Sequence, residues 1–130
     1  MSAQEDAKPS GLRILLVEDE ADTAATTAYL LQHFGHEVEV AADGLAALAK
    51  ARANWPDVVL LDIVLPGMDG YELARQLQAE GGRKPPLIIA VTGYAGEEFY
   101  RRSREVGITF FYLKPVAIED LQRLLGTLKR

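Results

Sequence analysis

The chain has 130 residues, a formal net charge of −5, 48% hydrophobic residues and 25% charged residues, which fits one globular domain and leaves little room for a second. The absence of cysteine excludes disulfides and thiolate chemistry, and no apolar run approaches the roughly 20 residues of a membrane helix. The acidic balance argues against direct nucleic-acid binding, which favours a basic surface. We therefore expect a cytoplasmic protein without nucleic-acid or membrane partners.

Residues 1–11 are polar, which predicts a disordered leader in front of a domain at 12–130. The leader lacks the apolar centre of a signal peptide. In the domain, short apolar runs predict strands at 12–17, 38–41, 58–61, 87–91 and 109–113. Amphipathic or alanine-rich segments between them predict helices at about 20–34, 43–53, 71–79, 97–106 and 118–128. Asp43 is expected to cap its helix, and Asp69 is expected to be a turn or cap residue.

Five strands that alternate with five helices predict βαβ units and a parallel sheet. Right-handed crossovers then restrict the chain to an α/β, doubly wound (βα)5 sandwich with helices on both faces. A flavodoxin-like strand order of 2-1-3-4-5 is expected, with ligands bound beyond the carboxyl ends of the strands.

Polar side chains follow four of the predicted strands. Glu18 and Asp19 come after the first strand, Asp62 after the third, Thr92 after the fourth and Lys114 after the fifth. Each alone is ordinary, since a single acid is usually a loop cap or a surface charge. Because the carboxyl ends of parallel strands lie at one edge of the sheet, the joint placement predicts a functional site there.

The charges of this set predict a metal ion. Glu18, Asp19 and Asp62 carry −3 when ionised, and Lys114 returns only +1. Two like charges about 4 Å apart repel by roughly 4 kcal/mol at an effective dielectric near 20, so a divalent cation is expected. An all-oxygen ligand set suits Mg2+ better than zinc. We predict a Mg2+ site formed by Asp19, Asp62 and a backbone carbonyl, with Glu18 binding directly or through water.

The segments LRILLVEDE, VVLLDIVLPGMDG, IIAVTG and FFYLKP, in this order, resemble the response-regulator receiver family of two-component phosphorelay signalling. The resemblance covers residues 13–128. It implies that Asp62 is the phosphoacceptor, that Glu18 and Asp19 hold Mg2+, and that the carbonyl of Val64 completes the metal site. It also implies that the protein is a signalling switch, not an enzyme for a separate substrate, although it would catalyse phosphorylation of Asp62 and hydrolysis of the product.

The same resemblance assigns the switch residues. Thr92 and Lys114 would contact the phosphoryl group, and Phe111 would swing into the space that Thr92 vacates. A cis bond between Lys114 and Pro115 is implied as well. Val64 and Tyr94 would tune the access of water, and because neither carries a carboxylate or amide, we hypothesise slow loss of the phosphoryl group.

Two departures from the family pattern stand out. The acid pair is Glu-Asp where Asp-Asp is commoner, so Glu18 is expected to reach the metal differently. Phe111 lacks the hydroxyl of the more frequent Tyr, and an ordinary core role remains an equal interpretation of it.

The implied partners are a sensor histidine kinase or phosphotransfer protein and a downstream protein target. A homodimer through the face of the fourth helix, fifth strand and fifth helix is a further candidate. The segments IIAVTGY and FFYLKPV favour a receiver that is attached to, or serves, a sensor kinase. The chain is then either a stand-alone receiver or a fragment of a longer protein.

Three alternatives remain open. An Asp-nucleophile phosphatase or phosphotransferase would need a second acid and usually a substrate cap, and no cap-sized insertion follows Asp62. A flavin-binding module would need a phosphate loop after the first strand, where this chain has acidic VEDEAD. A receiver-like docking module without phosphorylation would be expected to lack some of the site residues.

Other polar residues favour structural roles. His33 and His36 are expected at the surface or at a helix end. Trp55 is expected to pack before the third strand. The basic residues Arg101, Arg102 and Arg104 are expected to form a solvated helix face.

Overall fold

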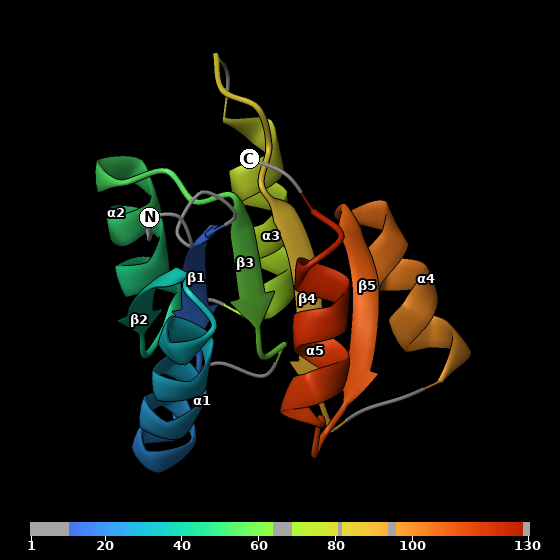
Figure 1. Ribbon diagram of the computed structural model, residues 1–130. Coiled ribbons are helices and arrows are strands. Elements are labelled where there is room, and N and C mark those ends of the chain that lie inside the picture. Colours follow the sequence, from blue (N-terminus) through green and yellow to red (C-terminus); the bar gives the residue numbers. More distant parts are fainter. Residues whose placement is uncertain (1–10, 64–68, 81, 94–95, 129–130) are drawn as a thin grey trace.

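The computed structural model describes residues 11–63, 69–80, 82–93 and 96–128. The predicted leader, apart from Gly11, lies outside this range. Five parallel strands form one sheet in the order β2-β1-β3-β4-β5, as the sequence predicts (Figure 1). The strands are β1 (Arg13–Val17), β2 (Glu37–Ala41), β3 (Val58–Leu61), β4 (Leu87–Thr92) and β5 (Ile108–Leu113).

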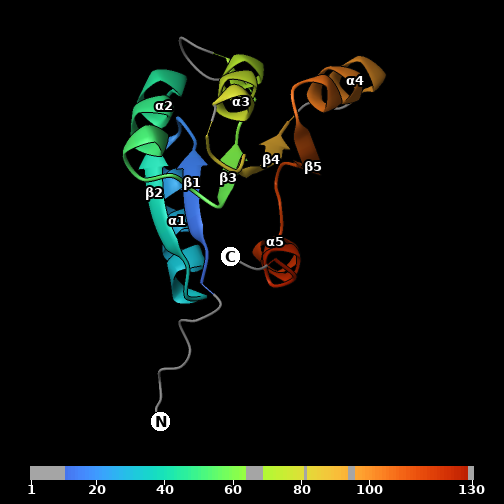
Figure 2. The same cartoon turned by 90° about the horizontal axis from the view of Figure 1, so that it is seen from above.

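Five helices alternate with the strands: α1 (Ala21–His33), α2 (Gly44–Ala53), α3 (Gly70–Ala79), α4 (Glu97–Glu105) and α5 (Ile118–Leu125). Figure 2 shows α2, α3 and α4 on one side of the sheet and α5 on the other. Apolar residues of α1 share a buried cluster with those of α5, so α1 belongs to the second side. Among the described residues, no helix is both long and apolar enough to cross a bilayer.

Carboxylates begin three of the helices. Asp43 accepts the N–H of Ala46 at 2.8 Å and caps α2, and Asp69 accepts the N–H of Glu72 at 2.9 Å and caps α3, as predicted. Glu20 caps α1 by accepting the N–H of Thr23 at 2.7 Å. Each carboxylate satisfies a backbone donor that has no partner inside its helix and lies where the helix dipole favours negative charge.

The end of α5 differs from the prediction, which extended this helix to residue 128. The helix ends at Leu125. The N–H of Gly126 still bonds four residues back, to the carbonyl of Gln122 at 2.8 Å, but the N–H groups after it bond only three residues back. The N–H of Thr127 donates to the carbonyl of Leu124 at 3.0 Å, and that of Leu128 donates to Leu125 at 3.1 Å. Tightening of this kind is common at helix ends.

The central strand β3 is buried on both faces. Its four residues are at most 1% exposed and alternate between two apolar clusters. Val58 and Leu60 face α1 and α5, whereas Val59 and Leu61 face the cluster that contains residues of α2 and α3. The continuous apolar run VVLL fits this environment, because a strand covered by helices on both sides has no polar face.

The pairing of β4 with β5 contains an irregularity that decides the orientation of the β5 side chains. Ile88 pairs with Ile108, but Ile89 pairs with Phe110, so Thr109 is the extra residue of a bulge. As a consequence, Ile108 and Phe111 pack into the same cluster although they are three residues apart. Regular alternation would have placed them on opposite faces.

His36 lies in the protein interior, so the expectation of a surface position is wrong for this residue. It is 7% exposed, and its Nδ1 accepts the N–H of Leu12 at 3.1 Å. Its Nε2 lies 2.9 Å from Oε1 of Gln122 in α5. Since Nδ1 accepts, the proton is on Nε2, and the ring joins the start of β1 to α5.

The other residues with expected structural roles lie as predicted. The Trp55 ring packs against the core beside Arg83, and its N–H donates to the carbonyl of Lys84 at 2.9 Å. His33 is exposed at the end of α1. The three arginines Arg101, Arg102 and Arg104 are exposed on α4.

Candidate functional site

The backbone positions Glu18 and Asp62 at the carboxyl edge of the sheet. The N–H of Asp62 donates to the carbonyl of Val17 at 3.1 Å, and the N–H of Glu18 donates to that of Ala41 at 3.0 Å. The parallel hydrogen-bond ladder therefore continues one residue beyond β1 and β3. Both carboxylates start from a rigid part of the sheet.

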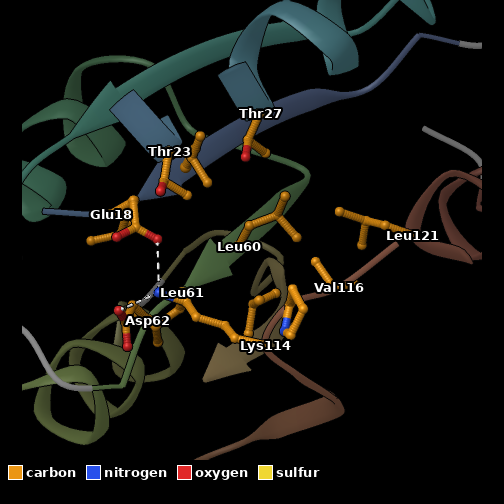
Figure 3. A pocket seen from close by; sticks show the side chains of 13 residues that line it. Glu18, Thr23, Thr27, Leu60, Leu61, Asp62, Lys114, Val116 and Leu121 are labelled. Carbon is orange, nitrogen blue, oxygen red and sulfur yellow. Dashed lines mark hydrogen bonds and ion pairs between the residues drawn. The ribbon is translucent and has the colours of Figure 1, made fainter. Parts of the chain in front are cut away.

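Lys114 bridges two carboxylates in this site. Its Nζ lies 3.0 Å from Oδ2 of Asp62 and 3.2 Å from Oε1 of Glu18. Figure 3 shows this amino group between the two acids. The N–H of Lys114 also donates to the carbonyl of Thr92 at 2.8 Å, which ties the end of β5 to the end of β4.

The pKa of Lys114 reflects two opposing causes. Burial lowers the pKa, but the hydrogen bonds and ion pairs with Asp62 and Glu18 raise it by more, and the net result lies above the ordinary value of 10.5. The side chain of Lys114 thus remains a cation at neutral pH, next to the carboxylate predicted to be the phosphoacceptor.

Three acids meet as predicted. One ligand atom each from Glu18, Asp19 and Asp62 lies within 4.8 Å of the others. Glu18 is buried, Asp62 is half-buried and Asp19 is exposed. This oxygen-only donor set, with an exposed member that leaves room for water ligands, fits Mg2+ and lacks the nitrogen and sulfur ligands typical of zinc. Lys114 offsets only one of the three negative charges.

Glu20 is a member of the site that the sequence did not single out. Its N–H donates to Oε2 of Glu18 at 3.2 Å, so the start of α1 is joined to the acid group. Hydrogen bonds from the hydroxyl and the backbone N–H of Thr23 lower the pKa of Glu20 below the ordinary 4.5. In the sequence, this cap is marked only by an acidic residue just before a predicted helix. Acidic residues are common at that position, so the pattern did not identify Glu20 as part of the site.

Gly70, the first residue of α3, lies directly against the backbone of Ile63, the residue after Asp62. The N–H of Gly70 donates to the carbonyl of Ile63 at 2.8 Å. A Cβ at residue 70 would lie 2.7 Å from Cα of Ile63 and 3.1 Å from the carbonyl oxygen of Asp62. Only glycine allows this close approach. The contact holds the start of α3 against the backbone of Asp62 and Ile63.

Thr92 and Phe111 lie on the neighbouring strands. Thr92 ends β4 and is 1% exposed. Phe111 is half-buried, and its ring centroid lies 5.4 Å from that of Phe99 and 5.3 Å from that of Tyr100, both in α4. The peptide bond between Lys114 and Pro115 is cis, as the family resemblance implies.

Two predicted site residues, Val64 and Tyr94, lie outside the described residues. A cavity of about 260 Å3 beside the acids was not predicted. It lies on the side of the sheet covered by α1 and α5, and Figure 3 shows its lining side chains. Its lining includes Leu16, Thr23, Thr27, Leu60, Val116 and Leu121, as well as Asp62 and Lys114. Such a cavity forms between elements and leaves no local sequence pattern.

The model of the response regulator receiver domain matches residues 14–126. The chain belongs to this family. It is 38% identical over 117 residues to the transcriptional regulatory protein CreB of Escherichia coli, covering 90% of this chain and 50% of CreB. It is 34% identical over 121 residues to the transcriptional regulatory protein TcrA of Mycobacterium tuberculosis, covering 93% of this chain and 47% of TcrA. The receiver thus spans about half the length of these two regulators.

Solved receiver structures share the fold. The chemotaxis protein CheY4 of Vibrio cholerae has a TM-score of 0.84 and 32% identity, over 90% of this receiver and 98% of CheY4. The receiver domain of the sensor histidine kinase PA1611 of Pseudomonas aeruginosa has a TM-score of 0.80 and 32% identity, over 90% of this receiver and 96% of the PA1611 domain. The PA1611 structure contains a magnesium ion coordinated in the active-site cleft. The similarity therefore extends to transcriptional regulators, a chemotaxis protein and the receiver of a sensor kinase.

Proposed function

We propose that Asp62 accepts a phosphoryl group from a sensor histidine kinase or a phosphotransfer protein, in a reaction that depends on Mg2+. The observation that carries this proposal is the position of Lys114, whose Nζ lies 3.0 Å from the Asp62 carboxylate at the rim where two further acids converge. The Asp62 carboxylate can act as the nucleophile. The Lys114 ammonium and a cation bound by the acids can neutralise the negative charge of the phosphoryl group.

The chemistry follows from these residues. A carboxylate oxygen of Asp62 attacks the phosphorus of the phosphohistidine, a phosphorus–oxygen bond forms, and the phosphorus–nitrogen bond breaks with its electron pair retained by the imidazole. Lys114 stays close to Asp62 and interacts favourably with the negative charge on the phosphoryl oxygens. Because the pKa of Lys114 is raised, this cation is fully formed at neutral pH.

Asp19 and Asp62 would hold the Mg2+ ion, together with the carbonyl of Val64, and Glu18 would bind directly or through water. When bound, the ion neutralises charge on the transferring phosphoryl group. The acid group is suited to it because three carboxylates facing one ammonium leave a net charge of −2. Relief of that repulsion favours binding of a divalent cation.

The switch is proposed to begin at Thr92. A phosphoryl group on Asp62 presents new acceptor oxygens, which would draw the Thr92 hydroxyl toward them. Phe111 would then leave its contacts with Phe99 and Tyr100 and move into the vacated space. This changes the surface formed by α4, β5 and α5, through which we propose that the protein binds a downstream target or a second copy of itself.

The protein is proposed to be a cytoplasmic switch that catalyses only its own phosphorylation and dephosphorylation. We also propose that hydrolysis is slow, because Val64 and Tyr94 offer no carboxylate or amide to orient a water. A half-life of only seconds in the phosphorylated domain would contradict this part of the proposal.

The central test is intact-mass spectrometry after incubation with Mg2+ and acetyl phosphate. The wild type and Asp120→Asn are expected to gain one phosphoryl mass, whereas Asp62→Asn gains none. Asp120 is a matched control, since it is an exposed aspartate on α5 paired with Arg123. The gain is expected to disappear when Mg2+ is removed with EDTA.

Other outcomes distinguish the alternatives. If the wild type gains no mass from acetyl phosphate or from a phosphorylated histidine kinase, and Mg2+ does not bind, the docking module becomes the better interpretation. Repeated turnover of an added phosphate ester would instead favour an Asp-nucleophile phosphatase.

A further inference from the structure

His36 lies just before β2, at the amino edge of the sheet and therefore at the opposite edge from the acid group. Its N–H donates to the carbonyl of Leu31 in α1 at 3.2 Å. Its Nδ1 accepts the N–H of Leu12, the residue before β1, at 3.1 Å, and its Nε2 lies 2.9 Å from Oε1 of Gln122 in α5. The residue is thus the meeting point of α1, β1 and α5.

The contact with Gln122 is the polar attachment of α5 to the domain. The helix buries Leu121 and Leu125 in the apolar cluster that it shares with α1. Its other side-chain hydrogen bonds stay inside the segment 118–128. In the part of the chain that the structure describes, no side-chain hydrogen bond except the one with His36 joins α5 to another element. Loss of this bond would leave α5 attached by its apolar side chains.

Protonation of the His36 ring would remove the acceptor on which this arrangement depends. A neutral imidazole with its proton on Nε2 accepts at Nδ1, whereas an imidazolium donates at both nitrogens. The new N–H at Nδ1 would face the N–H of Leu12, and turning the ring over would not help because both nitrogens then carry a proton. Leu12 is 1% exposed, so its N–H would lose its partner in the protein interior, which is unfavourable.

No ion pair balances an imidazolium at this position. The ring belongs to a residue that is 7% exposed, and among the described residues no carboxylate forms an ion pair with it. The titratable or charged side chains of β1, β2, α1 and α5 are Arg13, Asp22, Tyr29, His33, Glu37, Glu39, Glu119, Asp120 and Arg123. All of these are exposed except Arg13, which is half-buried and pairs with Glu37 at 3.4 Å. Because a buried charge without a partner is costly, the protonated ring would turn toward water and give up both of its contacts.

We propose that His36 is a proton-sensitive joint, and that protonation of its ring releases α5 from the start of β1. Histidine suits this role because it is the side chain that most readily changes its charge near neutral pH. The inference goes beyond the proposed function, since it involves neither Asp62 nor the acid group. Because α5 forms part of the surface proposed to bind a partner, mild acid would change that surface without phosphorylation.

The chain has two histidines, and exposed His33 supplies the matched control. Urea unfolding of the unphosphorylated protein is measured at about pH 7.5 and about pH 5.5 for the wild type, His36→Gln and His33→Gln. Glutamine offers an acceptor and a donor that do not titrate. The unfolded chain takes up a proton at residue 36 without losing any contact, so acid favours unfolding. On acidification, the unfolding equilibrium constants of the wild type and His33→Gln are expected to rise about fivefold or more beyond that of His36→Gln. An equal rise in all three proteins would overturn the proposal.

Amide NMR of the wild type and Gln122→Met over the same pH range tests the release of α5. In the wild type, the signals of Leu12 and of the α5 amides are expected to shift together as the His36 ring is protonated. In Gln122→Met, which loses only the bond to α5, Leu12 should still respond, whereas the α5 amides should not. This comparison remains decisive if His36→Gln does not fold. Protonation of the wild-type ring without any response of α5 would contradict the proposal, whether or not Asp62 accepts a phosphoryl group.

Discussion

At the scale of single residues, Lys114 carries the main electrostatic link of the site. Its ammonium contacts the carboxylates of Asp62 and Glu18, which start from different strands. Lys114 is therefore both a candidate for contact with the phosphoryl group and a connection between β5, β3 and β1. The second property has a consequence for stability that can be measured without any phosphoryl donor.

The raised pKa of Lys114 predicts a pH dependence of the free energy of unfolding. A base whose pKa is higher in the folded state stabilises the fold fully below its unfolded value, here about 10.5, and loses this contribution as the pH rises through the folded value. We expect wild type to exceed Lys114→Met in stability most at neutral pH. The difference should shrink above pH 10.5 in urea unfolding.

Comparison with the variant cancels the titration of tyrosines and other lysines in the same range. A difference that stays constant between pH 9 and pH 12 would contradict the role given to the two ion pairs. High salt should reduce the difference only modestly, since the pair with Glu18 is partly buried.

At the scale of elements, the start of α3 packs directly against the backbone that follows the end of β3. Asp69 caps α3, and Gly70 lies against the backbone of Ile63, one residue after Asp62. The helix start and the strand end are therefore held together by backbone contacts. This arrangement leaves no space for a side chain at residue 70.

Gly70→Ala is expected to destabilise the fold by about 2 kcal/mol or more, because its Cβ would meet backbone atoms that cannot move cheaply. It should also weaken Mg2+ binding, since the displaced segment carries Asp62. Gly93→Ala is the control: it is close to the site, but an added Cβ meets nothing within 4 Å. Its cost should stay within about 0.5 kcal/mol. Equal costs for the two variants in urea unfolding would contradict the close approach.

At the scale of the whole molecule, β3 supports two cores at once. Leu60 faces the cluster with α1 and α5, and Leu61 faces the opposite cluster. Each is 1% exposed. The sheet therefore couples both helix layers to the strand that ends at Asp62.

Leu60→Ala and Leu61→Ala are each expected to cost about 2–5 kcal/mol, the range for buried leucines. Both should lower the midpoint of a single cooperative transition seen by far-UV dichroism and by Trp55 fluorescence. Leu45→Ala is the matched control, because Leu45 is 67% exposed, and it should change stability by less than about 0.5 kcal/mol. Two separate transitions in either core variant would contradict the coupling.

Much of this architecture could be predicted from the sequence. Apolar runs separated by amphipathic segments located all ten elements, since a strand buried on both faces and a helix buried on one face need different residue patterns. The parallel sheet then brought Glu18, Asp19, Asp62 and Lys114 to one edge. Val64 and Tyr94 were predicted as well, and their roles stay predictions.

The tertiary structure alone decided other features, because they depend on contacts between distant segments. His36 is buried because Leu12 and Gln122 provide its two hydrogen-bond partners, one 24 and the other 86 residues away. Phe111 faces α4 because a bulge at Thr109 shifts the alternation of β5, and a bulge depends on the neighbouring strand. Likewise, the sequence could place Glu18 at the edge of the site, whereas its ion pair with Lys114 joins residues that are 96 positions apart and depends on the folded sheet.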